Sequence, residues 1–184
     1  MSSTLSAATW EAMSAPYDQP TYQAVLDLLN PEDVILDIGA GDLRLSRQMA
    51  LITQKVYAIE INAFVLKKGL TSRDPLPPNL IPTRADAQTY VFPTDTTVGV
   101  LMMRHCIHFR LYAEKLRRAG ARLLITNARW HMSVEVVDLQ AERISFREIG
   151  MGWYACLCGA TGFKVGPAGQ WSNEMDKKTA KSNR

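Results

Sequence analysis

The stretch VILDIGAGD (34–42) decides the fold class of this 184-residue chain. Its first five residues are apolar except for Asp37, which is the pattern of a strand buried on both faces. Gly39 and Gly41 follow directly, and glycines after a buried strand permit a tight turn and a close approach of a ligand to the backbone. A helical pattern then runs from about Leu43 to Ile52. The stretch therefore predicts a strand–turn–helix unit with a ligand site at the turn.

Strand-like and helix-like segments alternate from about residue 20 to residue 128. Apolar segments that indicate strands alternate with amphipathic segments that indicate helices, which favours a parallel sheet covered by helices. One helix face is formed by Tyr22, Val25, Leu26 and Leu29, and Asn30-Pro31 ends that helix. Further strands are expected at 56–61, 80–86, 98–103 and 121–128, and further helices at 62–70 and from Phe109 to Gly120.

Beyond residue 130 the pattern changes to short apolar segments separated by glycines or polar residues. The segments 134–139, 143–149, 152–158 and 162–166 predict an antiparallel addition at one edge of the sheet. A helix across Ser133 to Glu142 stays open, because that segment fits both periodicities. The predicted organisation is an N-terminal arm or lid (1–20), one domain (21–172) and a disordered basic tail (173–184).

Composition excludes several classes of protein. Apolar residues make up 47% and charged residues 21% of the chain, an ordinary globular balance. No apolar run approaches the roughly 20 residues that span a bilayer, and we expect no membrane partner and no secretory signal. Three cysteines without a disulfide framework suit the cytoplasm. The net charge of +3 gives little support to a polyanionic partner, since the last 12 residues hold four basic and two acidic side chains.

Two carboxylates frame the predicted ligand site. Glu60 follows Asp37 by 23 residues, at the end of the second strand, where a carboxylate can accept both ribose hydroxyls of an adenosine. A dinucleotide site needs a small residue at the third position of the glycine pattern, and Arg44 stands there. Asp37 would also repel a diphosphate, whereas it would attract the ammonium group of a methionine moiety. The residues therefore favour S-adenosylmethionine over NAD or NADP.

The series DIGAGD (37–42), VYAIEI (56–61) and RADA (84–87) resembles the class I, Rossmann-like S-adenosylmethionine-dependent methyltransferases. The resemblance covers roughly residues 20–128 and implies a doubly wound, mostly parallel sheet with helices on both faces. It implies that the first acid and the glycines hold the methionine part, the second acid the ribose, and the third acid the adenine. Leu43 departs from the family, many members of which have a third glycine there. The implied cofactor-binding residues are Asp37, Gly39, Ala40, Gly41, Glu60, Ile61, Asp86, Ala87 and Arg104.

The methyl acceptor is expected beyond the carboxyl ends of the fourth and fifth strands, where open parallel sheets bind ligands. His105 and His108 follow the fourth strand and are the candidate general bases, in that order, although a packed histidine is an equal alternative for each. Arg129 and Trp130 follow the fifth strand and are candidate substrate contacts. The Asp/Asn/Ser-Pro-Pro-aromatic pattern of base methylases is absent after the fourth strand.

No metal site is expected. The pair His105 and His108, with Cys106, lacks a matching distant ligand cluster, and Cys156-Leu-Cys158 lacks a second cysteine or histidine pair. For Cys156 and Cys158 a place in the core is favoured.

Three functions remain open. The leading one is methyl transfer to a small molecule. The second is methyl transfer to RNA, which a continuous basic patch would favour, and the third is a non-catalytic cofactor-binding subunit of a larger complex, which an exposed apolar strand within 134–166 would favour. The C-terminal strands also offer a surface for an oligomer. The basic patch would consist of Arg104, Arg110, Arg117, Arg118 and Arg129.

Overall fold

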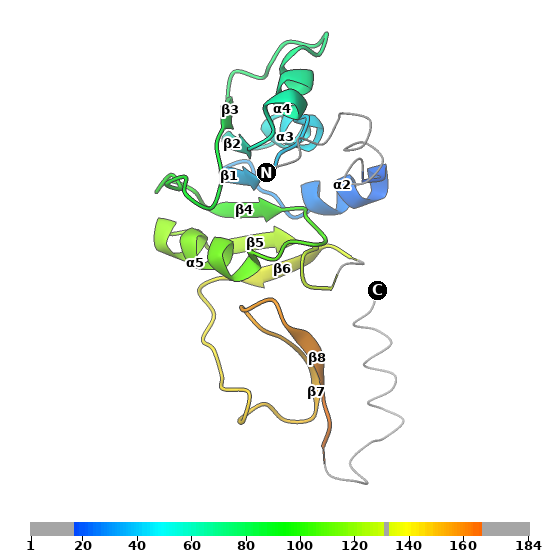
Figure 1. The fold of residues 1–184 in the computed structure, drawn as a ribbon, viewed down its shortest axis with the longest axis vertical. Helices are drawn as coiled ribbons and strands as arrows, with labels where there is room; N and C mark the ends of the chain where they lie inside the picture. The colour runs from blue at the N-terminus through cyan, green and yellow to red at the C-terminus, as the bar shows by residue number, and fades with distance from the viewer. Residues whose placement is uncertain (1–16, 131–132, 167–184) are drawn as a thin grey trace, which may run out of the picture.

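A six-stranded sheet forms the centre of the protein in a computed structural model that describes residues 17–130 and 133–166 (Figure 1). The strand order is β3-β2-β1-β4-β5-β6, in which only β6 is antiparallel to its neighbour. Most of the predicted arm and the whole predicted tail lie outside the described residues. The strands are β1 (Val34–Ile38), β2 (Lys55–Glu60), β3 (Leu80–Arg84), β4 (Val98–Leu101), β5 (Leu123–Thr126) and β6 (Glu135–Asp138).

Helices cover both faces of this sheet. On one face lie α2 (Gln19–Leu26), α3 (Arg44–Ala50) and α4 (Ala63–Leu70), and on the other lies α5 (Phe109–Ala119). The alternation of side chains along β1 divides the core accordingly, because Ile35 packs with the first group and Leu36 with α5. The predicted doubly wound α/β sheet is therefore confirmed.

Local chemistry explains where the helices begin and end. Asp18 caps α2 by accepting a hydrogen bond from the Thr21 amide at 3.0 Å, and Asn62 caps α4 in the same way. Gly120 ends α5 in the left-handed conformation, as the sequence predicted. The first helix is shorter than predicted: it ends at Leu26, and Leu29 already belongs to the connection to β1.

The C-terminal third differs in part from the prediction. Residues 135–138 form strand β6 on the edge of the main sheet, which resolves the ambiguity between helix and strand in favour of strand. In contrast, β7 (Gly152–Ala155) and β8 (Thr161–Lys164) pair only with each other, as a separate two-stranded sheet.

The predicted strand 143–149 is wrong, because this segment contains a turn instead. The ammonium group of Lys164 donates to the carbonyl oxygens of Phe146, Arg147 and Ile149, at 2.8 and 3.1 Å for the first two. Three carbonyls gathered around one cation are incompatible with strand pairing. No helix in the described part of the chain is long and apolar enough to cross a membrane.

Candidate functional site

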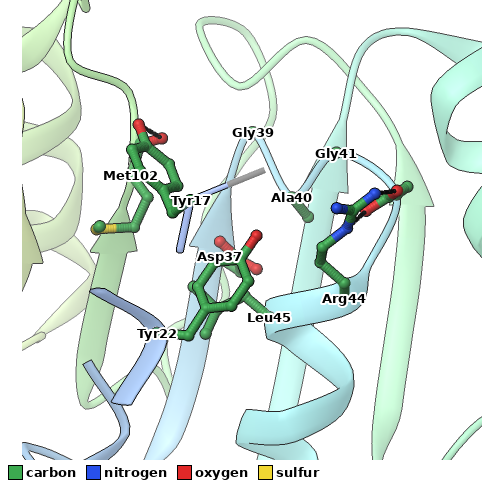
Figure 2. A pocket seen from close by; sticks show the side chains of 10 residues that line it. Tyr17, Tyr22, Asp37, Gly39, Ala40, Gly41, Arg44, Leu45 and Met102 are labelled. Carbon is green, nitrogen blue, oxygen red and sulfur yellow. Dashed lines mark hydrogen bonds and ion pairs between the residues drawn. The ribbon is translucent and has the colours of Figure 1, made fainter. Parts of the chain in front are cut away.

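A cleft opens at the carboxyl ends of β1 and β4, at the point where the strand order reverses. This is the place at which doubly wound sheets bind ligands. Figure 2 shows Asp37 in the middle of the group, with Tyr17 and Met102 on one side and Arg44 on the other. The lining residues are Tyr17, Tyr22, Asp37, Gly39, Ala40, Gly41, Asp42, Arg44, Leu45 and Met102.

The glycine loop is held in place by β2. The amides of Gly39 and Ala40 both donate to the carbonyl oxygen of Ile59, each at 2.9 Å. Gly39 has a φ of 76°, and a Cβ added there would lie 2.9 Å from the sulfur of Met103. The conformation and the crowding both require glycine. The loop can therefore present bare backbone to a ligand.

Leu43 occupies the position at which the resembled family often has a third glycine. Its φ of 65° is left-handed, and it is the non-glycine residue in that region of the described chain. Its side chain is fully buried among the core residues beneath α3 and α4. The loop thus has the backbone conformation that a glycine would adopt at position 43, although a leucine stands there.

Asp37 is buried at the floor of the cleft and accepts a hydrogen bond from the hydroxyl of Ser46 at 2.6 Å. Burial raises the pKa of Asp37 to about 7, opposed by the Ser46 hydrogen bond and reinforced by the nearby charge of Glu60. A cation placed beside this carboxyl group would favour its ionised form. Because the Asp37 carboxyl group is already buried, the binding of a cationic group beside it removes little further water from this carboxyl group.

Glu60 is also buried, and each of its carboxylate oxygens accepts one backbone hydrogen bond. Oε2 accepts from the Gly41 amide at 2.9 Å and Oε1 from the Asn62 amide at 2.7 Å. A carboxylate offers about four acceptor positions, so roughly two remain for a ligand. The adjacent Ile61 is 60% exposed, which leaves an apolar surface next to this carboxylate.

The loop after β3 carries the third predicted acid. Asp86 is half-buried and accepts from the Gln88 amide at 2.8 Å, and Ala87 beside it is buried. Lys115 of α5 fixes this loop. Its ammonium group donates to the carbonyl oxygens of Ala87, Gln88 and Tyr90, at 2.5, 3.0 and 2.6 Å.

On the β4 side of the cleft, Tyr17 lies against the strand end. Its hydroxyl donates to the carbonyl oxygen of Met102 at 2.9 Å, and the guanidinium carbon of Arg104 lies 4.8 Å from the centre of its ring. Tyr17 belongs to the predicted N-terminal arm or lid (1–20), of which residues 1–16 lie outside the described part of the chain. Its contacts depend on a fold in which residue 17 meets residue 102, so no local pattern could have revealed them.

The two candidate histidines stand in the connection from β4 to α5. His105 is exposed, and the ring of His108 packs edge-on against Tyr112, with 6.2 Å between ring centres. Neither histidine belongs to the residues that line the cleft, whereas Met102 of the same connection does. Their catalytic role stays a prediction.

The two residues after β5 have partners within the protein. Arg129 is only 7% exposed and forms an ion pair with Glu135, and it also donates to the carbonyl oxygen of Cys156 at 3.3 Å. Trp130 packs edge-on against Trp153, with ring centres 5.9 Å apart. These contacts join β5 to β6 and to the β7–β8 hairpin. A substrate role for either residue stays a prediction.

No protein-family model matches the chain, and no curated protein is detectably similar to it in sequence. Solved structures do resemble it. Precorrin 8w decarboxylase from Methanobacterium thermoautotrophicum has a TM-score of 0.54 and 19% identity over 61% of this chain and 63% of that protein. The 23S rRNA methyltransferase ErmE has a TM-score of 0.51 and 22% identity over 60% of this chain and 46% of that protein.

A third neighbour is phosphoethanolamine N-methyltransferase 1 from Haemonchus contortus, solved with phosphoethanolamine and S-adenosylhomocysteine. It has a TM-score of 0.50 and 17% identity over 59% of this chain and 25% of that protein. The chain has the fold of the class I S-adenosylmethionine-dependent methyltransferases. The matched region spans less than two thirds of each of these three neighbours.

Proposed function

We propose that this chain is an S-adenosylmethionine-dependent methyltransferase that acts on a small molecule. The observation that carries the proposal is the placement of two buried carboxyl groups at one glycine loop: Asp37 lines the cleft, and Glu60 accepts a hydrogen bond from the Gly41 amide. One suits the methionine ammonium, and the other keeps acceptor positions for ribose hydroxyls.

The residues present fit this cofactor. Gly39 lines the cleft and carries no side chain, so its backbone is exposed to a ligand there. Arg44 lines the cleft and is already oriented by Asp42, to which its Nε donates at 2.8 Å. A guanidinium in this position can bind the methionine carboxylate. Ile61 follows β2, and Asp86 and Ala87 follow the neighbouring strand β3, so they stand at the same edge of the sheet, where they would receive the adenosine.

When bound, the cofactor supplies a methyl group that its sulfonium has already activated. The tasks left to the chain are to align an acceptor with that methyl group and to remove a proton. Met102 and Tyr17 would border the acceptor, since both line the cleft at the end of β4. His105, or His108 as second choice, would take the proton once the connection 102–108 closes over an acceptor.

A small acceptor agrees better with the surface than RNA does. The basic patch that would favour RNA requires Arg129, and that side chain is buried in an ion pair with Glu135. Arg110 is paired with Glu114 at 2.7 Å. The patch that would favour RNA thus lacks Arg129, and the charge of Arg110 is balanced by Glu114.

A cofactor-binding subunit is a second candidate, because the region that would favour it does expose apolar side chains. Four apolar side chains around the β7–β8 hairpin are at least half exposed: Ile144, Phe146, Trp153 and Val165. A protein of this kind would bind S-adenosylhomocysteine but would show methyl transfer only with its partner.

Titration calorimetry with S-adenosylhomocysteine tests the cofactor assignment. Glu60→Gln should weaken binding about 10- to 100-fold, because it removes a charge-assisted hydrogen bond of about 1.5–3 kcal/mol. Glu32→Gln is the matched control, since Glu32 is exposed before β1, away from the cleft. Equal affinity of a folded Glu60→Gln protein and wild type would contradict the placement of the ribose. Absence of any binding by wild type would overturn the proposed function.

A further inference from the structure

The turn between β7 and β8 exposes two thiols that the proposed function does not use. Cys156 and Cys158 are both free and exposed, so their predicted place in the core is wrong. Leu157 between them is half-buried and packs against the hydrophobic cluster on the α5 side of the sheet. Leu157 is thus held against the protein, while the cysteines on both sides of it expose their sulfurs.

Four contacts fix the shape of this turn. The Cys156 amide donates to the Ala160 carbonyl oxygen at 2.7 Å, and the Gly159 amide donates to the Cys156 carbonyl oxygen at 3.0 Å. Arg129 donates to the same Cys156 oxygen and thereby ties the turn to β5. Gly159 has a φ of 98° and lies against the ring of Phe109, at the start of α5. The two cysteines are therefore held on a rigid support and need little ordering to act together.

The two sulfurs also interact. The Cys158 amide donates to the sulfur of Cys156 at 3.3 Å. The hydrogen bond with Cys156 lowers the pKa of the Cys158 thiol, with smaller contributions from the Ala160 amide and from the charge of Arg110. The third cysteine behaves in the opposite way, since burial raises the pKa of Cys106. The thiols of Cys158 and Cys106 therefore differ in the direction in which their surroundings shift the pKa.

We propose that Cys156 and Cys158 form a two-thiolate site for a soft, monovalent metal cation, with Cu(I) as the type case. Thiolates select soft cations. No group of three or more histidine, cysteine, aspartate or glutamate side chains that could hold a metal occurs within residues 17–130 and 133–166. A structural zinc ion needs four such ligands, whereas Cu(I) is stable with two sulfur ligands. This site is independent of the proposed methyl transfer.

Anaerobic competition between the full chain and the Cu(I) chelator bicinchoninate tests the proposal. The wild type should bind one Cu(I), and Cys156→Ser and Cys158→Ser should each weaken binding at least 100-fold. Cys106→Ala is the matched control and should bind Cu(I) like the wild type. Failure of the wild type to compete, or equal competition by Cys158→Ser, would overturn the site. Tight zinc binding that His105→Ala abolishes would also overturn it, because it would reveal a closed site with further ligands.

Phenylarsine oxide provides a measurement on the unmutated protein. Its arsenic forms two As–S bonds with a pair of neighbouring thiols, and its oxygen leaves with the two thiol protons as water, without a change of oxidation state. One equivalent should remove two of the three thiols that react with Ellman's reagent under denaturing conditions. Persistence of all three thiols would show that the two sulfurs cannot hold one atom between them, and would overturn the proposal.

Discussion

Leu43 holds a left-handed backbone conformation directly against Gly69 of α4, where it leaves no space for a side chain at position 69. A Cβ on Gly69 would lie 3.0 Å from Cγ of Leu43 and would collide with the carbonyl oxygen of Asp42. The conformation costs Leu43 roughly 1–2 kcal/mol, and full burial of a leucine contributes about 1.5–3 kcal/mol. Burial thus offsets the strain, provided that α4 has no side chain at position 69.

Gly69→Ala should therefore destabilise the protein, although alanine normally stabilises a helix by about 0.5–1 kcal/mol relative to glycine. The collision should lower the free energy of unfolding by about 1–3 kcal/mol, the usual cost of overpacking. Gly150→Ala is the control, since no atom lies within 4 Å of its added Cβ. Urea denaturation measures both. A Gly69→Ala protein as stable as wild type would mean that the glycine loop can move away from α4.

The ionisation of Asp37 should make stability fall as pH rises. Its pKa is about 7 in the folded protein and 3.8 as the reference value, so the folded state holds one more proton between these values. Unfolding then releases that proton, which means that raising the pH from 4 to 7 destabilises the protein, in total on the order of 4 kcal/mol. Asp37→Asn should lack this dependence. Parallel pH profiles of the two proteins in urea denaturation would contradict the burial argument.

The same carboxyl group should couple cofactor binding to proton release. At pH 6 Asp37 is mostly protonated, and the ammonium group of S-adenosylhomocysteine favours its ionised form. Binding should therefore release up to one proton at pH 6 and almost none at pH 8.5. Calorimetry in two buffers with different ionisation enthalpies counts the protons, and Asp37→Asn is the control. Proton uptake at pH 6 would have the wrong sign for an ammonium beside Asp37.

Lys115 should set the position of the loop that carries Asp86 and Ala87. Its ammonium group satisfies three carbonyl oxygens, which Met cannot do, so Lys115→Met should weaken S-adenosylhomocysteine binding about tenfold. Burial lowers the pKa of Lys115, so this side chain loses its proton at a lower pH than an ordinary lysine does. As the pH is raised, the affinity of the wild type for S-adenosylhomocysteine should therefore fall earlier than the pKa of an ordinary lysine would predict. Lys115→Arg should restore part of the binding. Arg118→Met, at an exposed position of the same helix, is the control.

The central strands and the glycine loop could be predicted because their signals are local. The run from Val34 to Ile38 is apolar enough to be buried on both faces, and the glycines after it permit the left-handed backbone of a tight turn. Asp37 and Glu60 could be located because they are the penultimate residue of β1 and the last residue of β2, and the carboxyl ends of parallel strands meet at one edge of the sheet.

Residues whose roles depend on distant partners could not be predicted. From the sequence, Arg129 is expected to be an exposed arginine after a strand, but in the folded chain it is buried in an ion pair with Glu135. Lys115 looks solvated on a helical projection, yet the loop after β3 covers it. The segment 143–149 has a strand-like composition, but Lys164 gathers its carbonyl oxygens into a turn. In each case a contact that exists only in the folded chain overrides the local pattern.

The histidine mechanism makes the last prediction. If His105 removes the acceptor's proton, His105→Ala should lower turnover about 10²- to 10⁴-fold and leave the affinity for S-adenosylhomocysteine unchanged. Ile107→Ala is the matched control, because Ile107 is exposed in the same connection between β4 and α5 and has no group that can accept a proton. Closure of this connection is required, since neither histidine lines the cleft without a ligand. A structure with S-adenosylhomocysteine should therefore show the His105 ring beside the sulfur. If both histidines stay outside the cleft there, and His105→Ala retains full turnover, the acceptor must lose its proton to water, and residues such as Tyr17 and Met102 would act by positioning alone.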